Sequence, residues 1–209
     1  VISSLPSKFG FSNNSFFSPR GEETNAGLIF YPHVNNIYGI ADGYQLLNDK
    51  LNAPVGLYSG KPPKIVPEDN WNEMKAAYAK QFKNNEIVVL ACTKAFGMGI
   101  DKSNIRYTIH TDIPGSIESF YQEAGRAGRD RKPAECTIII SNDYPQRTKK
   151  LLDPNTSLKE ISRTVKNLSF MEEDDITRSL FFHVKAFSGI EKEIKEVENI
   201  IDEMGDIAE

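Results

Sequence analysis

Five short apolar runs recur along the first two-thirds of the chain, separated by longer polar or amphipathic segments. They occupy residues 27–31, 53–60, 86–92, 105–112 and 135–141. Within Ile87–Leu90 and Ile138–Ile140 the apolar residues are consecutive and do not alternate with polar ones. Consecutive apolar residues are typical of strands buried on both faces. The pattern therefore predicts an α/β fold, with a parallel sheet flanked by helices.

Between these runs, the spacing of apolar residues predicts helices. The clearest lies at residues 71–82, where large apolar side chains recur at i, i+3, i+7 and i+11 from Trp71 to Phe82. A weaker helix is predicted at residues 34–50, which contain two glycines. A third helix is predicted to begin after Ser116, because serine often caps helices.

The two ends of the chain differ from this alternating pattern. Residues 1–25 are rich in Ser, Asn, Gly and Pro and are expected to be an irregular lead-in to an α/β domain at residues 26–150. Residues 151–209 are predicted to form a helical extension. Two capping boxes, at residues 157–160 and 188–191, mark helix starts there. After the second box an apolar seam repeats at 4-3-4-3 spacing, which predicts packing onto the domain or onto a protein partner.

The composition, 39% hydrophobic and 26% charged over 209 residues, is that of a soluble globular protein. No apolar run approaches the roughly 18 residues of a membrane span, so no membrane partner is expected. The chain opens at Val1 with neither a Met nor a signal sequence. We interpret it as an interior part of a longer, cytoplasmic protein.

The sequence predicts no metal site. Its two cysteines, Cys92 and Cys136, lie in apolar runs, and both are expected to be buried free thiols. Two cysteines cannot form a four-cysteine zinc site. The three histidines, His33, His110 and His183, are scattered along the chain.

The net charge of −4 gives no general electrostatic case for nucleic-acid binding. The charge is unevenly spread, however. From Leu158 to Glu209 there are 7 Lys/Arg and 13 Asp/Glu, leaving 18 and 16 in the first 157 residues. Four of these basic residues cluster at residues 126–132. The basic signal is therefore local, and the tail is acidic.

The loop Cys92–Asp101 (CTKAFGMGID), which follows the third run, combines features that suit a phosphate group. In parallel sheets, binding residues gather beyond the carboxyl ends of the strands. Thr93 supplies a hydroxyl and Lys94 a positive charge. Gly97 and Gly99 allow the backbone to approach a ligand closely. The phosphate could belong to a nucleotide or to a nucleic-acid backbone, although this loop by itself is equally typical of a tight turn.

A second candidate site lies at residues 119–130 (SFYQEAGRAGRD). Gln122, Arg126 and Arg129 fall at i, i+4 and i+7 and are predicted to share one helix face. Arginine makes planar, bidentate contacts to phosphate, and the small residues between the arginines leave room for an anion or a neighbouring domain. The alternative is an exposed basic helix end closed by a glycine cap.

Together, ACTKAFGMGID and SFYQEAGRAGRD resemble motifs V and VI of superfamily 2 helicases, and their residues are similar to those of the RecQ family. The run GLIFYPHV resembles the weaker motif IV. The resemblance covers about residues 26–145. It implies the second RecA-like motor domain of a DNA helicase. In that family ATP and Mg²⁺ lie in a cleft between two such domains and are held mainly by the first.

The resemblance also implies roles for individual residues. Arg129 would be the arginine finger that reaches the γ-phosphate, supported by Arg126 and Gln122. The residues implied at the nucleotide side of the cleft are Gly97, Gly99 and Asp101, and those implied at the nucleic-acid backbone are Thr93 and Lys94. The expected partners are single-stranded or forked DNA, the first RecA-like domain of the same polypeptide, and a protein that binds the acidic helical tail.

Several parts of such a helicase are missing from the sequence. It contains no G-x-x-x-x-G-K-[ST] phosphate loop and no Asp-Glu pair after a buried strand. The first motor domain is therefore absent, and this chain alone is expected not to hydrolyse ATP. The turn Tyr58–Gly60 lacks the histidine usual in the family. RecQ proteins usually continue into a four-cysteine zinc region, whereas Leu151–Glu209 contains no cysteine, so the sequence resembles a divergent member.

Two other functions stay open from the sequence. A related motor acting on RNA would carry the same glycine loop and arginine pair, although the RecQ-like sequences of the two motifs favour DNA. A non-catalytic docking module could keep the fold and use the basic cluster and the acidic tail to bind partners. A phosphate loop and an acid pair upstream of this chain would favour the motor.

Overall fold

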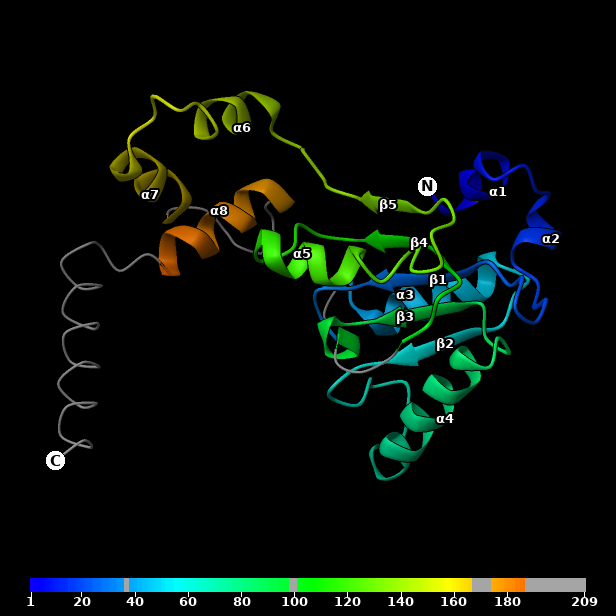
Figure 1. Cartoon of the computed structure of the whole chain (residues 1–209). Helices are drawn as coiled ribbons and strands as arrows, with labels where there is room; N and C mark the ends of the chain where they lie inside the picture. Colours follow the sequence, from blue (N-terminus) through cyan, green and yellow to red (C-terminus); the bar gives the residue numbers. More distant parts are fainter. Residues whose placement is uncertain (36–37, 98–100, 167–173, 187–209) are drawn as a thin grey trace, which may run out of the picture. The chain divides into compact units, whose positions relative to one another are not determined.

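A computed structural model shows the arrangement of the chain (Figure 1). The residues that it describes are 1–35, 38–97, 101–166 and 174–186. The chain divides into two compact units, Val1–Ile139 and Ile140–Glu209. Among the described residues, the first unit carries the whole sheet and the second only helices. The three-part division expected from the sequence stays a prediction.

The expected parallel sheet is confirmed, with five strands in the order β2-β3-β1-β4-β5. The strands are β1 (Ala26–Phe30), β2 (Val55–Tyr58), β3 (Val89–Cys92), β4 (Ile105–His110) and β5 (Glu135–Ile138). Phe30 lies opposite both Cys92 and His110, and Tyr58 also lies opposite Cys92. The carboxyl ends of β1 to β4 are therefore level, and the loops that follow them meet along one edge of the sheet.

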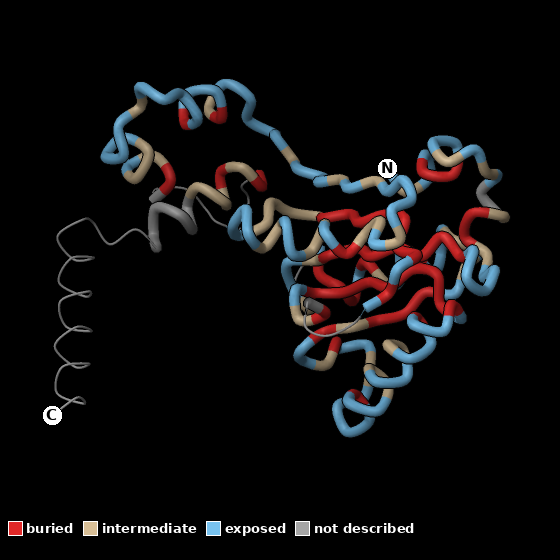
Figure 2. The backbone as a smooth tube through the Cα atoms, in the orientation of Figure 1, coloured by how far each residue is buried: buried red, intermediate tan, exposed pale blue. Residues whose placement is uncertain are grey.

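Neighbouring residues of the central strand β1 point into two different cores. Ile29 joins one cluster with Leu57 and Tyr107, whereas Leu28 and Phe30 join another. Alternate residues of a strand face opposite sides of a sheet, so both sides are covered. Figure 2 shows the central strands as the buried part of the first unit.

Two of the helices that cover the sheet were expected from apolar spacing. Helix α4 (Trp71–Lys83) agrees with its prediction, and both Trp71 and Phe82 are buried. Helix α3 (Ile40–Lys50) begins later than predicted. The reason is local: Tyr38 has a φ of 63°, which is incompatible with a right-handed helix.

Helix α5 (Ile117–Ala124) begins where the sequence predicted. Ser116 is its N-cap, and the Ser116 Oγ accepts a hydrogen bond from the Ser119 backbone N–H at 3.1 Å. This bond satisfies one of the backbone donors that a helix start leaves free. None of the residues of α5 is fully buried.

The lead-in is more ordered than the sequence indicated. It contains the 3₁₀ turn η1 (Ile2–Ser4) and the short helices α1 (Leu5–Lys8) and α2 (Asn13–Phe16). The ring of Phe16 stacks on Tyr107 with 5.9 Å between centroids, and Phe17 meets the same ring edge-on. The several phenylalanines of this segment therefore belong to the core of the sheet, which explains their presence in an otherwise polar stretch.

The prediction that the fifth run is buried on both faces was wrong. Ile138 and Ile139 are each 40% exposed, and Cys136 is exposed, whereas Cys92 is buried as expected. The edge position alone is not the reason, because the other edge strand, β2, is buried where α3 and α4 pack on it. Among the described elements, no helix packs on β5 to a comparable extent. An apolar run cannot reveal whether helices cover its strand.

The described part of the second unit is helical, as predicted. It contains α6 (Pro145–Leu151), α7 (Leu158–Lys166) and α8 (Asp175–Ala186). Ser157 Oγ accepts a hydrogen bond from Glu160 N at 3.3 Å, which confirms the first capping position. The second capping box and the apolar seam lie outside the described residues. Within the described ranges, no helix is both long enough and apolar enough to cross a membrane.

Candidate phosphate- and nucleic-acid-binding site

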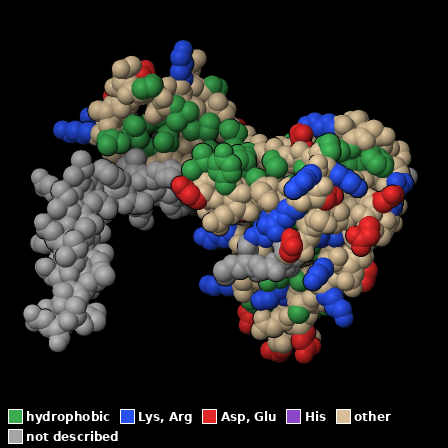
Figure 3. All heavy atoms as spheres, in the orientation of Figure 1, with side chains coloured by type: hydrophobic (Ala, Val, Ile, Leu, Met, Phe, Trp, Pro, Cys, Tyr) green, Lys and Arg blue, Asp and Glu red, His purple; other side chains and the backbone are tan. Residues whose placement is uncertain are grey.

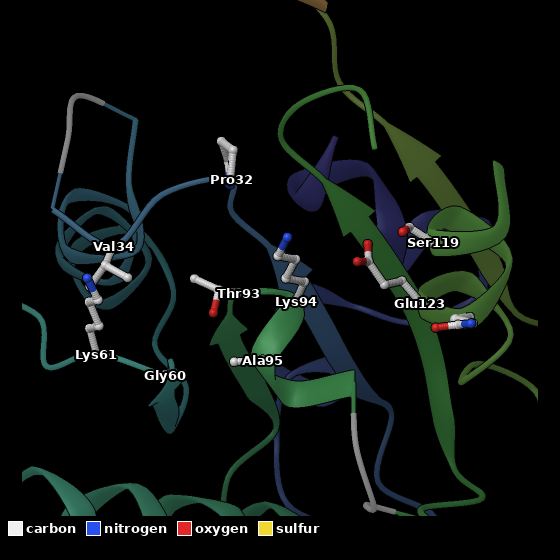
Figure 4. Close-up of a pocket in the computed structure, with 10 residues that line it drawn as sticks. Pro32, Val34, Gly60, Lys61, Thr93, Lys94, Ala95, Ser119 and Glu123 are labelled. Carbon is white, nitrogen blue, oxygen red and sulfur yellow. The ribbon is translucent and has the colours of Figure 1, made fainter. Parts of the chain in front are cut away.

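A hollow of about 530 Å³ opens beyond the carboxyl ends of the strands. Its walls come from the segments that follow β1, β2 and β3, and from α5, which follows β4. The residues that line it are Pro32, Val34, Gly60, Lys61, Thr93, Lys94, Ala95, Ser119, Gln122 and Glu123 (Figure 4). Four chain segments that are distant in the sequence thus meet at one place.

Thr93 and Lys94 reach the hollow from the end of β3. The Thr93 N–H donates to the Tyr58 carbonyl at 3.1 Å, and the Phe96 N–H donates to the Thr93 carbonyl at 3.0 Å. The chain therefore turns at once into the 3₁₀ helix η3 (Lys94–Gly97). Phe96, 1% exposed, anchors this turn in the core and leaves Lys94 exposed. The role of both residues at a nucleic-acid backbone stays a prediction.

Lys61 supplies a second positive charge to the hollow, and the sequence analysis missed it. It follows Gly60 directly after β2, and Ser59 Oγ donates a hydrogen bond to its carbonyl oxygen. Figure 4 shows Lys61 and Lys94 on different segments of the wall. The rule that binding residues follow strand ends could have found Lys61, because it comes immediately after the second apolar run.

The predicted face shared by Gln122, Arg126 and Arg129 does not exist. Helix α5 ends at Ala124, and both arginines lie in the turns that follow it. The glycines explain the early end. A Cβ on Gly125 would lie 2.7 Å from the Tyr121 carbonyl oxygen, and Gly128 has a φ of 69°, which L-residues rarely adopt.

Gln122 and the two arginines consequently occupy different environments. Gln122 lines the hollow, whereas Arg126 and Arg129 are not among its lining residues. Arg126 is only 6% exposed. Burial lowers the pKa of Arg126, and the nearby Arg129 lowers it further. The two guanidinium groups are therefore close enough to repel each other.

Arg129 is exposed and forms an ion pair with Asp101, with 2.8 Å between Nη1 and Oδ1. Its Nε also donates to the Gly125 carbonyl at 3.4 Å. The structure thus brings together Arg129, the implied arginine finger, and Asp101, implied at the nucleotide side of the cleft. Gly97 ends η3, and Gly99 lies outside the described residues.

The loop that carries the arginines is anchored to β4 by Arg106, another residue that sequence reasoning missed. Arg106, 6% exposed, pairs with Asp130 and donates to the Pro133 carbonyl at 3.2 Å. The hydrogen bond from Arg106 lowers the pKa of Asp130. The Gly128 N–H adds a bond of 2.9 Å to the Ile105 carbonyl. These contacts fix the backbone on which Arg129 stands.

The donor set of this region suits phosphate oxygens, which only accept hydrogen bonds. The guanidinium groups of Arg126 and Arg129 and the amide of Gln122 all offer N–H donors. Lys and Arg side chains elsewhere on the visible face of the first unit lie among Asp and Glu (Figure 3). In the part of the chain that the structure describes, no group of three His, Cys, Asp or Glu is placed to hold a metal ion. The residues present therefore suit phosphate oxygens.

Comparison with known proteins identifies the domain. The family model of the helicase conserved C-terminal domain matches residues 17–131. The ATP-dependent DNA helicase RecQ of Haemophilus influenzae is 46% identical over 144 residues, covering 68% of this chain and 21% of that protein. The RecQ protein of Bacillus subtilis is 50% identical over 70 residues, covering 34% of this chain and 12% of that protein. This chain thus spans about a fifth or less of the length of these relatives.

A solved structure, domain 2 of the DEAD-box helicase Mss116p bound to an RNA duplex, is 17% identical and aligns over 78% of this chain and 68% of that one. Its TM-score of 0.47 is too low to add to the assignment. The family match, which spans more than half of the chain, and the five-stranded parallel sheet lead to the same conclusion. The chain belongs to the helicase conserved C-terminal domain family, as a RecQ-like superfamily 2 member with a RecA-like fold.

Proposed function

We propose that this chain is the second motor domain of an ATP-dependent DNA helicase or translocase, with Arg129 as its arginine finger. The observation that carries the proposal is the setting of Arg129. Its side chain is exposed, a second arginine lies nearby, and its loop is fixed to β4 through Arg106 and Asp130. A finger needs this combination of a rigid base and a reachable tip.

The chemistry of phosphoryl transfer favours such an arrangement. ATP supplies a γ-phosphoryl group whose transfer to water develops negative charge on the oxygens around phosphorus. A finger arginine stabilises that charge and contributes about 10³ to 10⁵ in rate. Arg126, in the same turns as Arg129, and Gln122, near the end of α5, would support Arg129. Because this chain holds no phosphate loop, the nucleotide would be bound mainly by a first motor domain, and hydrolysis would require the two domains to close.

The hollow would bind the sugar-phosphate backbone of the DNA strand. Lys61 and Lys94 provide positive charge, and Thr93 provides a hydroxyl at the end of β3. Contacts of this kind position a strand without reading its bases. The names of the RecQ relatives favour DNA over RNA as the substrate.

The test uses the longer polypeptide that contains this chain and its first motor domain. Arg129→Ala should reduce DNA-stimulated ATP hydrolysis by at least a hundredfold while changing ATP affinity by less than about threefold. Arg131→Ala is the matched control, because Arg131 is an exposed arginine on the same loop. If Arg129→Ala leaves turnover within twofold of wild type, the finger assignment is wrong.

The isolated chain provides a second test. Without a partner domain it should bind no ATP tightly and turn over none. Stoichiometric ATP hydrolysis by the purified chain would contradict the proposed division of labour between the two motor domains.

A further inference from the structure

We infer that His110 and Glu123 form a positioning pair that holds the last turn of α5 against the carboxyl end of β4. The pair would set the place of Gln122, which precedes Glu123, and of Arg126, whose backbone N–H donates to the Glu123 carbonyl at 3.4 Å. The inference rests on the proposed function and adds to it a residue pair that acts on the arginine loop from beneath the helix. Neither His110 nor Glu123 was predicted from the sequence to be a functional residue.

The pair joins the sheet to the helix at the edge of the hollow. His110 Nε2 lies 3.0 Å from Glu123 Oε2, and the two side chains are 2% and 12% exposed. The two polar atoms are in contact, although they are not aligned as a hydrogen bond. Figure 4 shows the Glu123 side chain at the wall that α5 contributes.

The His110 ring is itself held firmly. It stacks on Phe30, the last residue of β1, with 4.9 Å between centroids and 11° between planes. The ring of Phe120, on α5, contacts the His110 ring edge-on, with 5.2 Å between centroids. A ring fixed by two neighbours and by its strand is a rigid anchor for a carboxylate on a neighbouring helix.

Helix α5 needs such an anchor because it buries no residue fully. An eight-residue helix without a buried apolar side chain gains little from packing, and an isolated helix of that length is unstable in water. The contacts of His110 with Glu123 and with Phe120 are therefore the specific links between this helix and the strand below it.

Glu123 is also electrostatically connected to the arginine loop. Burial raises the pKa of the Cys92 thiol, and the Glu123 carboxylate raises it further, while Arg126 acts in the opposite direction. The carboxylate thus lies near the ends of both β3 and β4 and near the buried guanidinium of Arg126. A shift of Glu123 would change the position of the helix and the charge balance around Arg126 together.

The pair would affect the reaction by fixing the position of the arginine loop. A displacement of about 1 Å in a catalytic group can reduce a rate about a hundredfold. Loosening the pair should therefore lower kcat for DNA-stimulated ATP hydrolysis and leave KM for ATP nearly unchanged, because most of the nucleotide is held by the other domain. A residue that contacted ATP in the ground state would raise KM instead.

The experiment is a double-mutant cycle in the longer polypeptide, with Glu123→Gln, His110→Gln and the combination of both. Each single substitution is expected to lower kcat at least tenfold, and the double variant should be no worse than the worse single one. Glu118→Gln is the control, since Glu118 is an exposed carboxylate on the same helix, and it should stay within twofold of wild type.

Adding Arg129→Ala to Glu123→Gln distinguishes a misplaced arginine finger from a protein that has lost its fold. In the Glu123→Gln background this substitution should reduce kcat by a smaller factor than in wild type, because the finger is already misplaced. This comparison decides the matter even if His110→Gln does not fold. Multiplicative losses in the cycle, or turnover within twofold of wild type for Glu123→Gln, would overturn the positioning pair. If Arg129→Ala has no effect in wild type, the proposed function fails instead.

Discussion

Arg129 and Asp101 face each other across an exposed ion pair, with 2.8 Å between Nη1 and Oδ1. The pair links the turn after α5 to the segment before β4. The Asp101 side chain is 85% exposed and that of Arg129 is 42% exposed, so both charges remain hydrated. A phosphate oxygen would compete with Asp101 for the same guanidinium group.

Removing one partner of this pair should barely affect stability. Exposed ion pairs contribute less than about 1 kcal/mol, because water screens the attraction. Asp101→Asn should therefore change the free energy of unfolding of the chain by less than about 1 kcal/mol, measured by urea denaturation. A loss of more than about 2 kcal/mol would show that Asp101 supports the fold and does not merely face Arg129.

The two lysines of the hollow can be tested through the salt dependence of DNA binding. Each phosphate contact that is lost should reduce the slope of log K against log[salt] by about 1. Lys61→Ala and Lys94→Ala should each weaken the binding of single strands of different sequence to a similar extent. Titrations of the longer polypeptide at several salt concentrations provide the measurement.

Lys50→Ala is the control for these titrations. Lys50 is the last residue of α3 and precedes the amino-terminal end of β2, whereas the hollow lies beyond the carboxyl ends of the strands. This substitution should leave the slope unchanged. Equal slopes for Lys61→Ala and Lys50→Ala would remove Lys61 from the DNA-binding surface.

Gly27 of β1 is predicted to tolerate no side chain. A Cβ at this position would lie 1.9 Å from the ring of Tyr107, which is fully buried and held by Phe16 and Phe17. Gly27→Ala should destabilise the chain by about 3 kcal/mol through overpacking. Gly115→Ala is the matched control, since nothing lies within 4 Å of a Cβ there. Equal unfolding midpoints for the two variants would contradict the packing described for Tyr107.

Lys102 should make stability depend on pH. Its ammonium group donates to Asn85, lies 5.2 Å from the centroid of the Phe82 ring, and is 5% exposed as a residue. Burial lowers the pKa of Lys102 to about 8, against the smaller opposing effect of Glu22. The unfolded chain, in which the lysine has its ordinary pKa of 10.5, therefore binds more protons than the folded one between pH 8 and pH 10.5. Stability should rise with pH through this window and should level off at its lower value below pH 8, where both states carry the proton.

The size of this effect is best measured as a difference between wild type and Lys102→Met. Between pH 7.5 and 9.5 the free energy of unfolding of wild type should gain about 1 kcal/mol relative to the variant, after allowance for solvent screening. Burial raises the pKa of Tyr31 and Tyr78 to about 12, so both oppose folding at still higher pH, but they cancel in the difference. Parallel pH profiles for the two proteins would show that Lys102 does not titrate in this window.

The sequence was sufficient to predict the five strands and the helices α3, α4 and α5, because apolar runs, apolar spacing and a capping serine are local features of each element. Predictions from the sequence were wrong where the structure of a segment depends on residues outside the pattern from which it was predicted. The run that contains Ile138 and Ile139 predicted a strand buried on both faces, yet both residues are 40% exposed, because no described helix covers β5 as α3 and α4 cover β2. Arg126 and Arg129 were expected on one helix face, but the glycines beside them end the helix first.

From the amino-acid order alone one could derive the parallel α/β fold, the loop that follows each strand and the two motifs of the family. Which side chains meet could be found only by folding the chain. Arg106 reaches Asp130, and His110 reaches Glu123, because β4 lies beneath the helix and loop that follow it. Periodicity reports how a residue is oriented within its own element. Contacts between elements depend on how those elements pack against one another in three dimensions, which no local pattern encodes.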